Sequence, residues 1–339
     1  MFATTSLSVL RRVLPALLLM AVLSSIAAGA EPGLAYPAGS AVNDQKAGSI
    51  LVYNLYSSSP TNPAVLNTRF NLTNTHDTRG IFVHLFFIEG ASCSVIDRFI
   101  CLSESQTMQF SALDQDPGTT GYLIAAATDF NGVPTNFNYL IGDEAVKLDT
   151  GHFANLAAES ISAIAPQPAQ INPDQSLAGL VFDDVAYNRL PAVLAASNIP
   201  SRADGNDTVI VINSILALST EGLSIRANAI GAMFGILYDD QEQPHSFNAN
   251  AACQVLLRLS FSFPKTVPRF EVVIPAGQTG WLKIWGTQMP APILGAMINY
   301  NQNASASASR FNSGHNLHKL RLENRAPARI TVPIFPPGC

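Results

Sequence analysis

The sequence predicts an all-β protein made of two immunoglobulin-like antiparallel β-sandwich domains, with one short helix near the domain junction. Short runs rich in Val, Ile, Phe and Tyr recur roughly every 8–12 residues, a spacing typical of sandwiches. The 339 residues include 22 Pro and 22 Gly, which supply turns between such strands. Pieces of the first half also recur in the second half, which indicates an internal duplication.

Composition restricts the class of protein further. Hydrophobic residues make up 47% of the chain and charged residues only 13%, so the chain can bury a large core and is not intrinsically disordered. The formal net charge is −5. Nucleic acid is excluded as a partner, because binding to phosphates needs a basic surface.

Residues 1–30 are predicted to be a Sec-type signal peptide. Arg11 and Arg12 precede the apolar run Val13–Leu23, and the segment ends in the small-x-small sequence Ala28-Gly29-Ala30. The apolar run is too short for a membrane span, which needs about 20 residues. We therefore expect a secreted, periplasmic or cell-surface bacterial protein with no span after signal removal. Its mature N-terminus would be Glu31.

A flexible arm is expected over 31–46 and the first sandwich over 47–165. The expected strands of the first sandwich are Ser49–Tyr56, Thr68–Asn74, Ile81–Glu89, Val95–Leu102, Thr107–Ser111, Gly121–Thr128 and Phe137–Ile141. The short helix is expected at His152–Ala165, where Phe153, Leu156 and Ile161 recur at helical spacing.

A Pro-rich linker over 166–176 is expected to lead into the second sandwich, 177–339. The strongest sign of duplication is the likeness of Asp116–Leu123 (DPGTTGYL) to Pro275–Leu282 (PAGQTGWL). We expect Gly118 and Gly277 to form equivalent turns with positive φ. Tyr122 and Trp281 should then be buried beneath their turns, in a manner that resembles the tyrosine corner of immunoglobulin domains.

Four cysteines in an exported chain predict two disulfides. The spacing C-x₇-C favours a bond between Cys93 and Cys101 that clips a hairpin. Cys253 would then pair with Cys339, the final residue. Zinc binding is the alternative, although the chain lacks the closely spaced C-x₂₋₄-C pair of zinc sites.

Most chemical motifs are absent, and no catalytic residue is predicted. The chain has no G-x-S-x-G and no H-E-x-x-H sequence. The pair His315 and His318 falls on opposite faces if this segment is a strand.

The one cofactor candidate is calcium, at Asp204, Asn206 and Asp207 around Gly205. This loop lacks the complete calcium ladder, so an ordinary Asp-Gly turn is the alternative interpretation.

Several stretches resemble a loose group of uncharacterised secreted proteins from environmental bacteria. They are QKAGSILVYNLYSSS, SRADGNDT, GHNLHKL and the ending VPIFPPGC. The resemblance implies export and carries no assigned activity.

The expected function is structural, adhesive or ligand-binding, without chemistry, and the partner is a surface polymer, a glycan or a protein. The alternative is an extracellular carbohydrate-binding protein or a glycoside-active enzyme that uses clustered acids and aromatic residues. Trp281 and Trp285 are four residues apart and share one face of a strand. If Trp281 is exposed beside Trp285, the sugar-stacking hypothesis takes precedence over the scaffold hypothesis.

Overall fold

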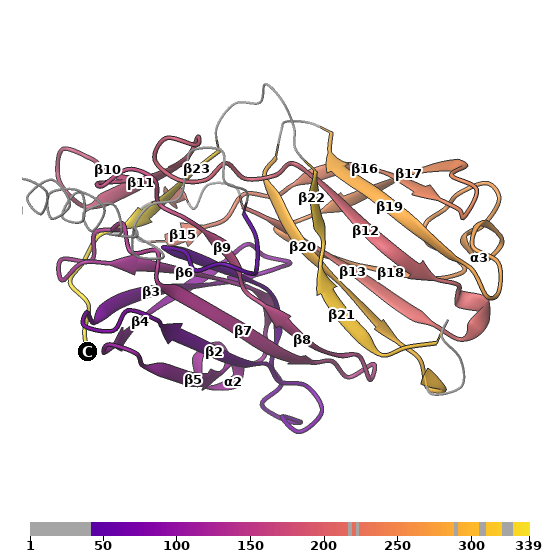
Figure 1. Ribbon diagram of the computed structural model, residues 1–339, viewed down its shortest axis with the longest axis horizontal. Helices are drawn as coiled ribbons and strands as arrows, with labels where there is room; N and C mark the ends of the chain where they lie inside the picture. The colour runs from indigo at the N-terminus through magenta and orange to yellow at the C-terminus, as the bar shows by residue number, and fades with distance from the viewer. Residues whose placement is uncertain (1–41, 216–218, 222–223, 288–290, 305–309, 321–327) are drawn as a thin grey trace, which may run out of the picture.

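The computed structural model describes residues 42–339 except 216–218, 222–223, 288–290, 305–309 and 321–327 (Figure 1). The predicted signal peptide, 1–30, lies outside the described residues. Among those that are described, no helix is long and apolar enough to cross a bilayer. Nearly all regular structure is antiparallel β, which confirms the predicted fold class.

The first sandwich consists of a five-stranded and a four-stranded sheet. The five-stranded sheet has the order β4-β3-β6-β1-β9 and the four-stranded sheet β5-β2-β7-β8. The strands are β1 (Ile50–Ser57), β2 (Arg69–Asn74), β3 (Ile81–Glu89), β4 (Val95–Leu102), β5 (Thr107–Ser111), β6 (Thr120–Thr128), β7 (Leu140–Lys147), β8 (Phe153–Ala157) and β9 (Glu159–Ile161). Alternate residues such as Leu51, Leu85 and Phe70 meet between the sheets in one apolar core.

The second sandwich repeats this topology strand for strand. Its sheets have the orders β17-β16-β19-β12-β22 and β18-β13-β20-β21. The strands are β12 (Val193–Pro200), β13 (Asp207–Ser214), β16 (Gly231–Tyr238), β17 (Pro244–Ala251), β18 (Gln254–Leu259), β19 (Thr279–Gly286), β20 (Ile293–Tyr300), β21 (Ser313–Asn316) and β22 (His318–Leu320). Even the short helices α2 (Ala112–Gln115) and α3 (Phe270–Val273) precede equivalent strands, β6 and β19.

Pairing register confirms the duplication in detail. Strands β1 and β12 each carry an irregularity before a residue that pairs with Gly121 or Gly280, respectively. Gly118 and Gly277 occupy equivalent turns with φ of 83° and 80°. The strand order differs from the A-B-E-D and C-F-G sheets of immunoglobulin domains, because β6 here lies between β1 and β3.

Within the described ranges, a third layer covers the first sandwich and not the second. Strands β10 (Ala169–Ile171), β11 (Leu177–Phe182) and β23 (Ala328–Pro333) form a three-stranded sheet, at the upper left of Figure 1. Side chains such as Leu180 and Ile330 pack on the outer face of the five-stranded sheet. The segment expected as linker thus contains β10, and the chain returns from the second sandwich to the first through β23.

Two local predictions are wrong. His152–Ala165 forms β8 and β9 rather than a helix, because Phe153 and Asn155 are exposed while Ala154 and Leu156 are buried, a period of two. The expected arm ends earlier than residue 46, since Val42 is buried in the core and Asn43 bridges to Ser160.

The cysteine pairing is also wrong. The bonds join Cys93 to Cys253, with Cα atoms 5.4 Å apart, and Cys101 to Cys339, with Cα atoms 6.2 Å apart. Strand β4 begins two residues after Cys93 and contains Cys101 near its other end. A strand of this length spans about 25 Å, well beyond disulfide reach. Two disulfides are typical of proteins from oxidising compartments.

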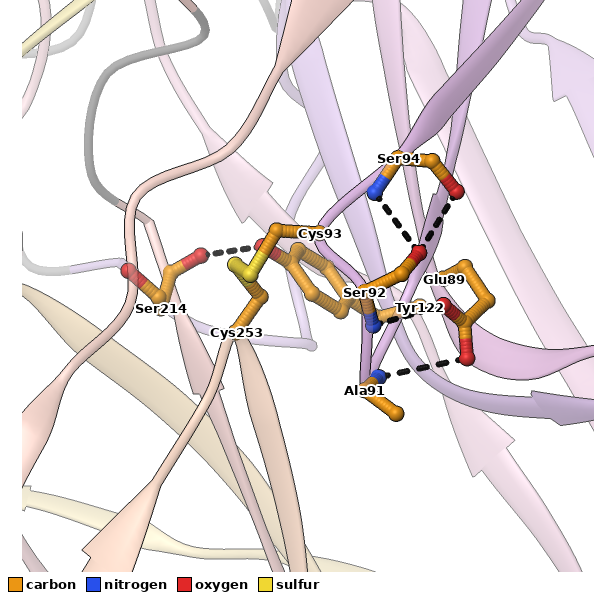
Figure 2. Close-up of a disulfide and its surroundings, with 8 residues drawn as sticks. All are labelled: Glu89, Ala91, Ser92, Cys93, Ser94, Tyr122, Ser214 and Cys253. Carbon is orange, nitrogen blue, oxygen red and sulfur yellow. Dashed lines mark hydrogen bonds between the residues drawn. A yellow bond between two sulfur atoms is a disulfide. The ribbon is translucent and has the colours of Figure 1, made fainter.

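The Cys93–Cys253 bond joins the two sandwiches (Figure 2). Beside it, the buried Tyr122 hydroxyl donates to the backbone oxygen of Ser214 at 2.6 Å. The predicted tyrosine corner is therefore wrong in its partner: the ring is buried as expected, but its hydroxyl binds the other sandwich instead of its own turn.

Buried amides complete this seam between the sandwiches. The Gln254 side chain donates to the Gly121 backbone oxygen at 3.0 Å and to Asn213 Oδ1 at 2.8 Å. The Asn54 side chain donates to Asn316 Oδ1 at 2.9 Å. Because buried polar groups are costly when unpaired, this network specifies one relative placement of the two sandwiches.

One ion pair in the seam gives the stability a defined pH dependence. Glu159 on β9 is fully buried and its carboxylate contacts the Lys319 ammonium on β22. Burial raises the pKa of Glu159 from 4.5 to about 7, although Lys319 opposes the shift. Because the folded pKa exceeds the unfolded value, the stabilising contribution of this group is complete below pH 4.5 and is lost as pH rises to 7.

We therefore expect the free energy of unfolding of the wild type to fall, relative to that of Glu159→Gln, by about 3 kcal/mol between pH 4.5 and 7. Denaturant unfolding at several pH values measures this difference. The exposed Glu104 provides the control, and Glu104→Gln should follow the wild-type profile. A wild-type curve parallel to that of Glu159→Gln would contradict the assignment.

Candidate functional site: an aromatic face on the second sandwich

The outer side of the five-stranded sheet of the second sandwich carries a group of partly exposed aromatic residues. Leu282 and Ile284 on β19 point into the core, so Trp281, Lys283 and Trp285 point outward. On β16, Phe234 pairs with Trp285 and Tyr238 pairs with Trp281. We call the surface formed by Phe234, Tyr238, Trp281, Lys283 and Trp285 the aromatic face.

The rings form two cross-strand pairs. Tyr238 and Trp281 are stacked, with centroids 3.9 Å apart and planes 6° apart. Phe234 and Trp285 are tilted, with centroids 5.1 Å apart. Trp281 and Trp285 are four residues apart on one strand, which places them about 13 Å apart. The two pairs therefore form a row along the sheet.

The prediction that Trp281 is buried beneath its turn is therefore wrong. Its counterpart Tyr122 is 1% exposed, whereas Trp281 is partly exposed. Tyr122 shares one core with residues of β11 and β23 and with Ile215 and Cys253 of the second sandwich. No strand of the described ranges packs over the aromatic face.

The outer faces of the two five-stranded sheets carry different residues at equivalent positions. Where the second sandwich has Tyr238, Lys283 and Trp285, the registers place Ile88, Ile124 and Ala126 in the first. All three are buried against the third sheet. The remaining two positions, those of Phe234 and Trp281, hold His84 and Tyr122 in the first sandwich. The covered face is thus a mixture of aliphatic and aromatic residues, whereas the open face has an aromatic ring at four of the five positions.

Polar groups of the aromatic face have no hydrogen-bond or ion-pair partner among the described residues. Within the described part of the chain, the Tyr238 hydroxyl and the indole N–H groups of Trp281 and Trp285 form no hydrogen bond. Lys283 has no acidic partner there, and its Nζ lies 5.7 Å from the Trp285 ring centroid.

Exposed amides lie beside the rings on the edge strand β17. Asn248 pairs in register with Phe234, and Asn250 with Ala232. Both side chains are exposed and have no hydrogen bond to described residues. On the opposite flank, Ser197 Oγ and His318 Nε2 are 2.9 Å apart.

Another outer face of the same protein behaves differently. On the four-stranded sheet of the first sandwich, Asn71 donates to Asp143 at 2.9 Å and accepts from Gln109 at 3.1 Å. Thr73 and Thr107 bond to each other at 2.8 Å. These polar side chains bond to one another, whereas the described residues offer no such partners to the polar groups of the aromatic face.

The calcium hypothesis finds no support in the loop geometry. Asp204 Oδ2 accepts from the Gly277 backbone at 2.7 Å, and Asn206 Oδ1 accepts from Asn299 and Asn301. Asp207 is bound by Arg258 and by Arg202, and Arg258 holds its pKa below the usual value in spite of burial. These oxygens tie the loop to neighbouring strands, and the described residues contain no cluster of three or more metal-ligating side chains.

Other sequence candidates are dispersed. The rings of His315 and His318 are 6.0 Å apart, and each binds a different protein oxygen. His84 is buried, and its Nε2 lies 2.8 Å from Asp97 Oδ2; burial lowers the pKa of His84 although Asp97 opposes the shift.

Sequence reasoning found Trp281 and Trp285 but missed Phe234 and Tyr238. The signal was present in β16, where Phe234 and Tyr238 have the same four-residue spacing and alternate with core residues. What the sequence could not supply is the register that brings the two strands together.

Comparisons with known proteins assign no family. No family model and no curated protein matches the chain. A solved structure of tripeptidyl peptidase 2 aligns with 88% of this chain at 10% identity, with a TM-score of 0.19. The aligned region covers 25% of that peptidase, and a likeness at this level carries no argument.

Proposed function

We propose that this protein is an exported, non-enzymatic binding protein of the cell envelope or extracellular space. The sandwiches form one rigid support, and the aromatic face is the binding surface. The observation that carries the proposal is the internal comparison: one sheet face occurs twice, and among the described residues no further sheet covers the copy in the second sandwich, where four aromatic side chains are partly exposed. Partly exposed aromatic residues that gather on one uncovered surface favour an interaction site.

Rigidity supports a binding role. The disulfide, the buried amides and the apolar contacts of Val146 and Leu156 with Val211 hold the sandwiches in one arrangement. A surface on a rigid support loses little conformational entropy when it binds a ligand. The support thus suits adhesion or recognition.

Retention on a panel of immobilised extracellular polymers tests the proposal. The panel would contain peptidoglycan, cellulose, chitin, alginate, collagen and fibronectin. We expect the wild type to bind at least one polymer without shortening it, and the double variant Trp281→Ala/Trp285→Ala to lose that binding. Phe130 on the first sandwich is 71% exposed, so Phe130→Ala is the matched control. Equal retention of the double variant and the wild type, or cleavage of the bound polymer, would contradict the proposal.

A further inference from the structure

The geometry points to a carbohydrate chain as the ligand of the aromatic face, an inference that rests on the binding function proposed above. The argument has three steps: the chemistry of the rings, the chemistry of the flanks, and the comparison with the covered face of the first sandwich.

The rings provide the apolar part of a sugar site. The flat side of an aromatic ring carries negative charge density at its centre. The C–H groups on one side of a pyranose ring are weakly positive. A sugar therefore packs flat on an aromatic ring, here on the face of Trp281 that the stacked Tyr238 ring leaves uncovered. The two ring pairs lie along one strand direction about 13 Å apart, a span that suits a chain of several sugar rings better than one monosaccharide.

The flanks provide the polar part. A sugar presents hydroxyl groups around its edge, each of which both donates and accepts hydrogen bonds. Asn248 and Asn250 offer amides that do both, and Tyr238 offers a hydroxyl. Trp281 and Trp285 offer indole donors. None of these groups has a partner in the described chain.

The covered face excludes the simplest protein partner. Where this fold receives a further β-sheet, the position of Lys283 holds Ile124 and that of Trp285 holds Ala126, in one core with Leu180 and Ile330. A second copy or an added apolar sheet would require such a surface. It would instead bury the Lys283 ammonium and the two indole N–H groups without partners, which is costly.

A microarray of defined neutral and acidic oligosaccharides, probed with labelled whole protein, tests this inference. We expect binding to oligosaccharides and none to the corresponding monosaccharides. Titration of the best oligosaccharide should show affinity reduced about tenfold or more in Trp281→Ala and in Trp285→Ala, as for central aromatic contacts. Phe130→Ala should bind like the wild type. Tyr238→Phe keeps the stacked ring and should lose a few-fold in affinity, as expected for one hydrogen bond.

Circular dichroism and thermal unfolding check that each variant is folded. If a tryptophan variant does not fold, the affinity of Tyr238→Phe still tests the inference. Absence of binding to every oligosaccharide would overturn the inference. If collagen or fibronectin is then retained through Trp281 and Trp285, the binding function stands and only the ligand class is wrong. A concentration-dependent dimer that Trp281→Ala abolishes would overturn the inference in favour of a second copy. Loss of all retention would overturn both proposals.

Discussion

Replacing Cys93 and Cys253 together with alanine is expected to lower the free energy of unfolding by about 5 kcal/mol. The bond closes a loop of 160 residues, and the chain-entropy relation assigns a loop of that length about 5 kcal/mol. A loss of this size equals much of the net stability of an ordinary protein. Urea unfolding of the oxidised wild type and the double variant measures it.

The second disulfide provides the control. Cys101–Cys339 closes a longer loop. Residues 334–339 form no strand, however, and the last two residues, Gly338 and Cys339, are exposed. The tail can fray when this bond is removed, so the folded state also gains freedom, and Cys101→Ala/Cys339→Ala should cost less. Peptide mapping checks both bonds, and a Cys93–Cys101 peptide would contradict the structure.

Truncating Tyr122 to alanine is expected to cost about 3–5 kcal/mol, the range for large core aromatics. The ring is 1% exposed within a core shared by the first sandwich and the third sheet. Its hydroxyl also joins the two sandwiches through Ser214, so Tyr122→Phe alone should cost about 1 kcal/mol by removing this buried hydrogen bond. Denaturant unfolding measures both losses.

Trp281→Ala is the matched comparison, because the duplication places Trp281 at the equivalent position. Its ring is partly exposed and stacks on Tyr238 alone among the aromatic residues described. We expect a loss of about 1 kcal/mol, in the range of an aromatic pair. Equal costs at the two positions would show that the aromatic face is a structural core and would remove the basis of the binding proposal.

Much of the fold could be predicted because strand formation is governed by local pattern. The expected limits of Ile81–Glu89, Val95–Leu102 and Thr107–Ser111 match β3, β4 and β5. The glycines Gly118 and Gly277 identified the duplication because a turn with positive φ requires glycine or a similar residue wherever it occurs. Where the spacing was ambiguous, as at His152–Ala165, the alternation of burial on a real sheet decided the outcome.

The sequence by itself determined the β-class, the duplication, the presence of four cysteines and one half of the aromatic face, since each depends on residue type and spacing along the chain. Tertiary structure alone decided how the cysteines pair, because strand β4 separates Cys93 from Cys101 while folding brings Cys253 near. It also decided which copy of the repeated sheet face is open. Strands β11 and β23 are distant in sequence, yet they pair and, together with residues of the second sandwich, form the core that contains Tyr122, whereas Trp281 stays partly exposed. A pattern of alternating residues gives which side of a strand is apolar but not what will cover it.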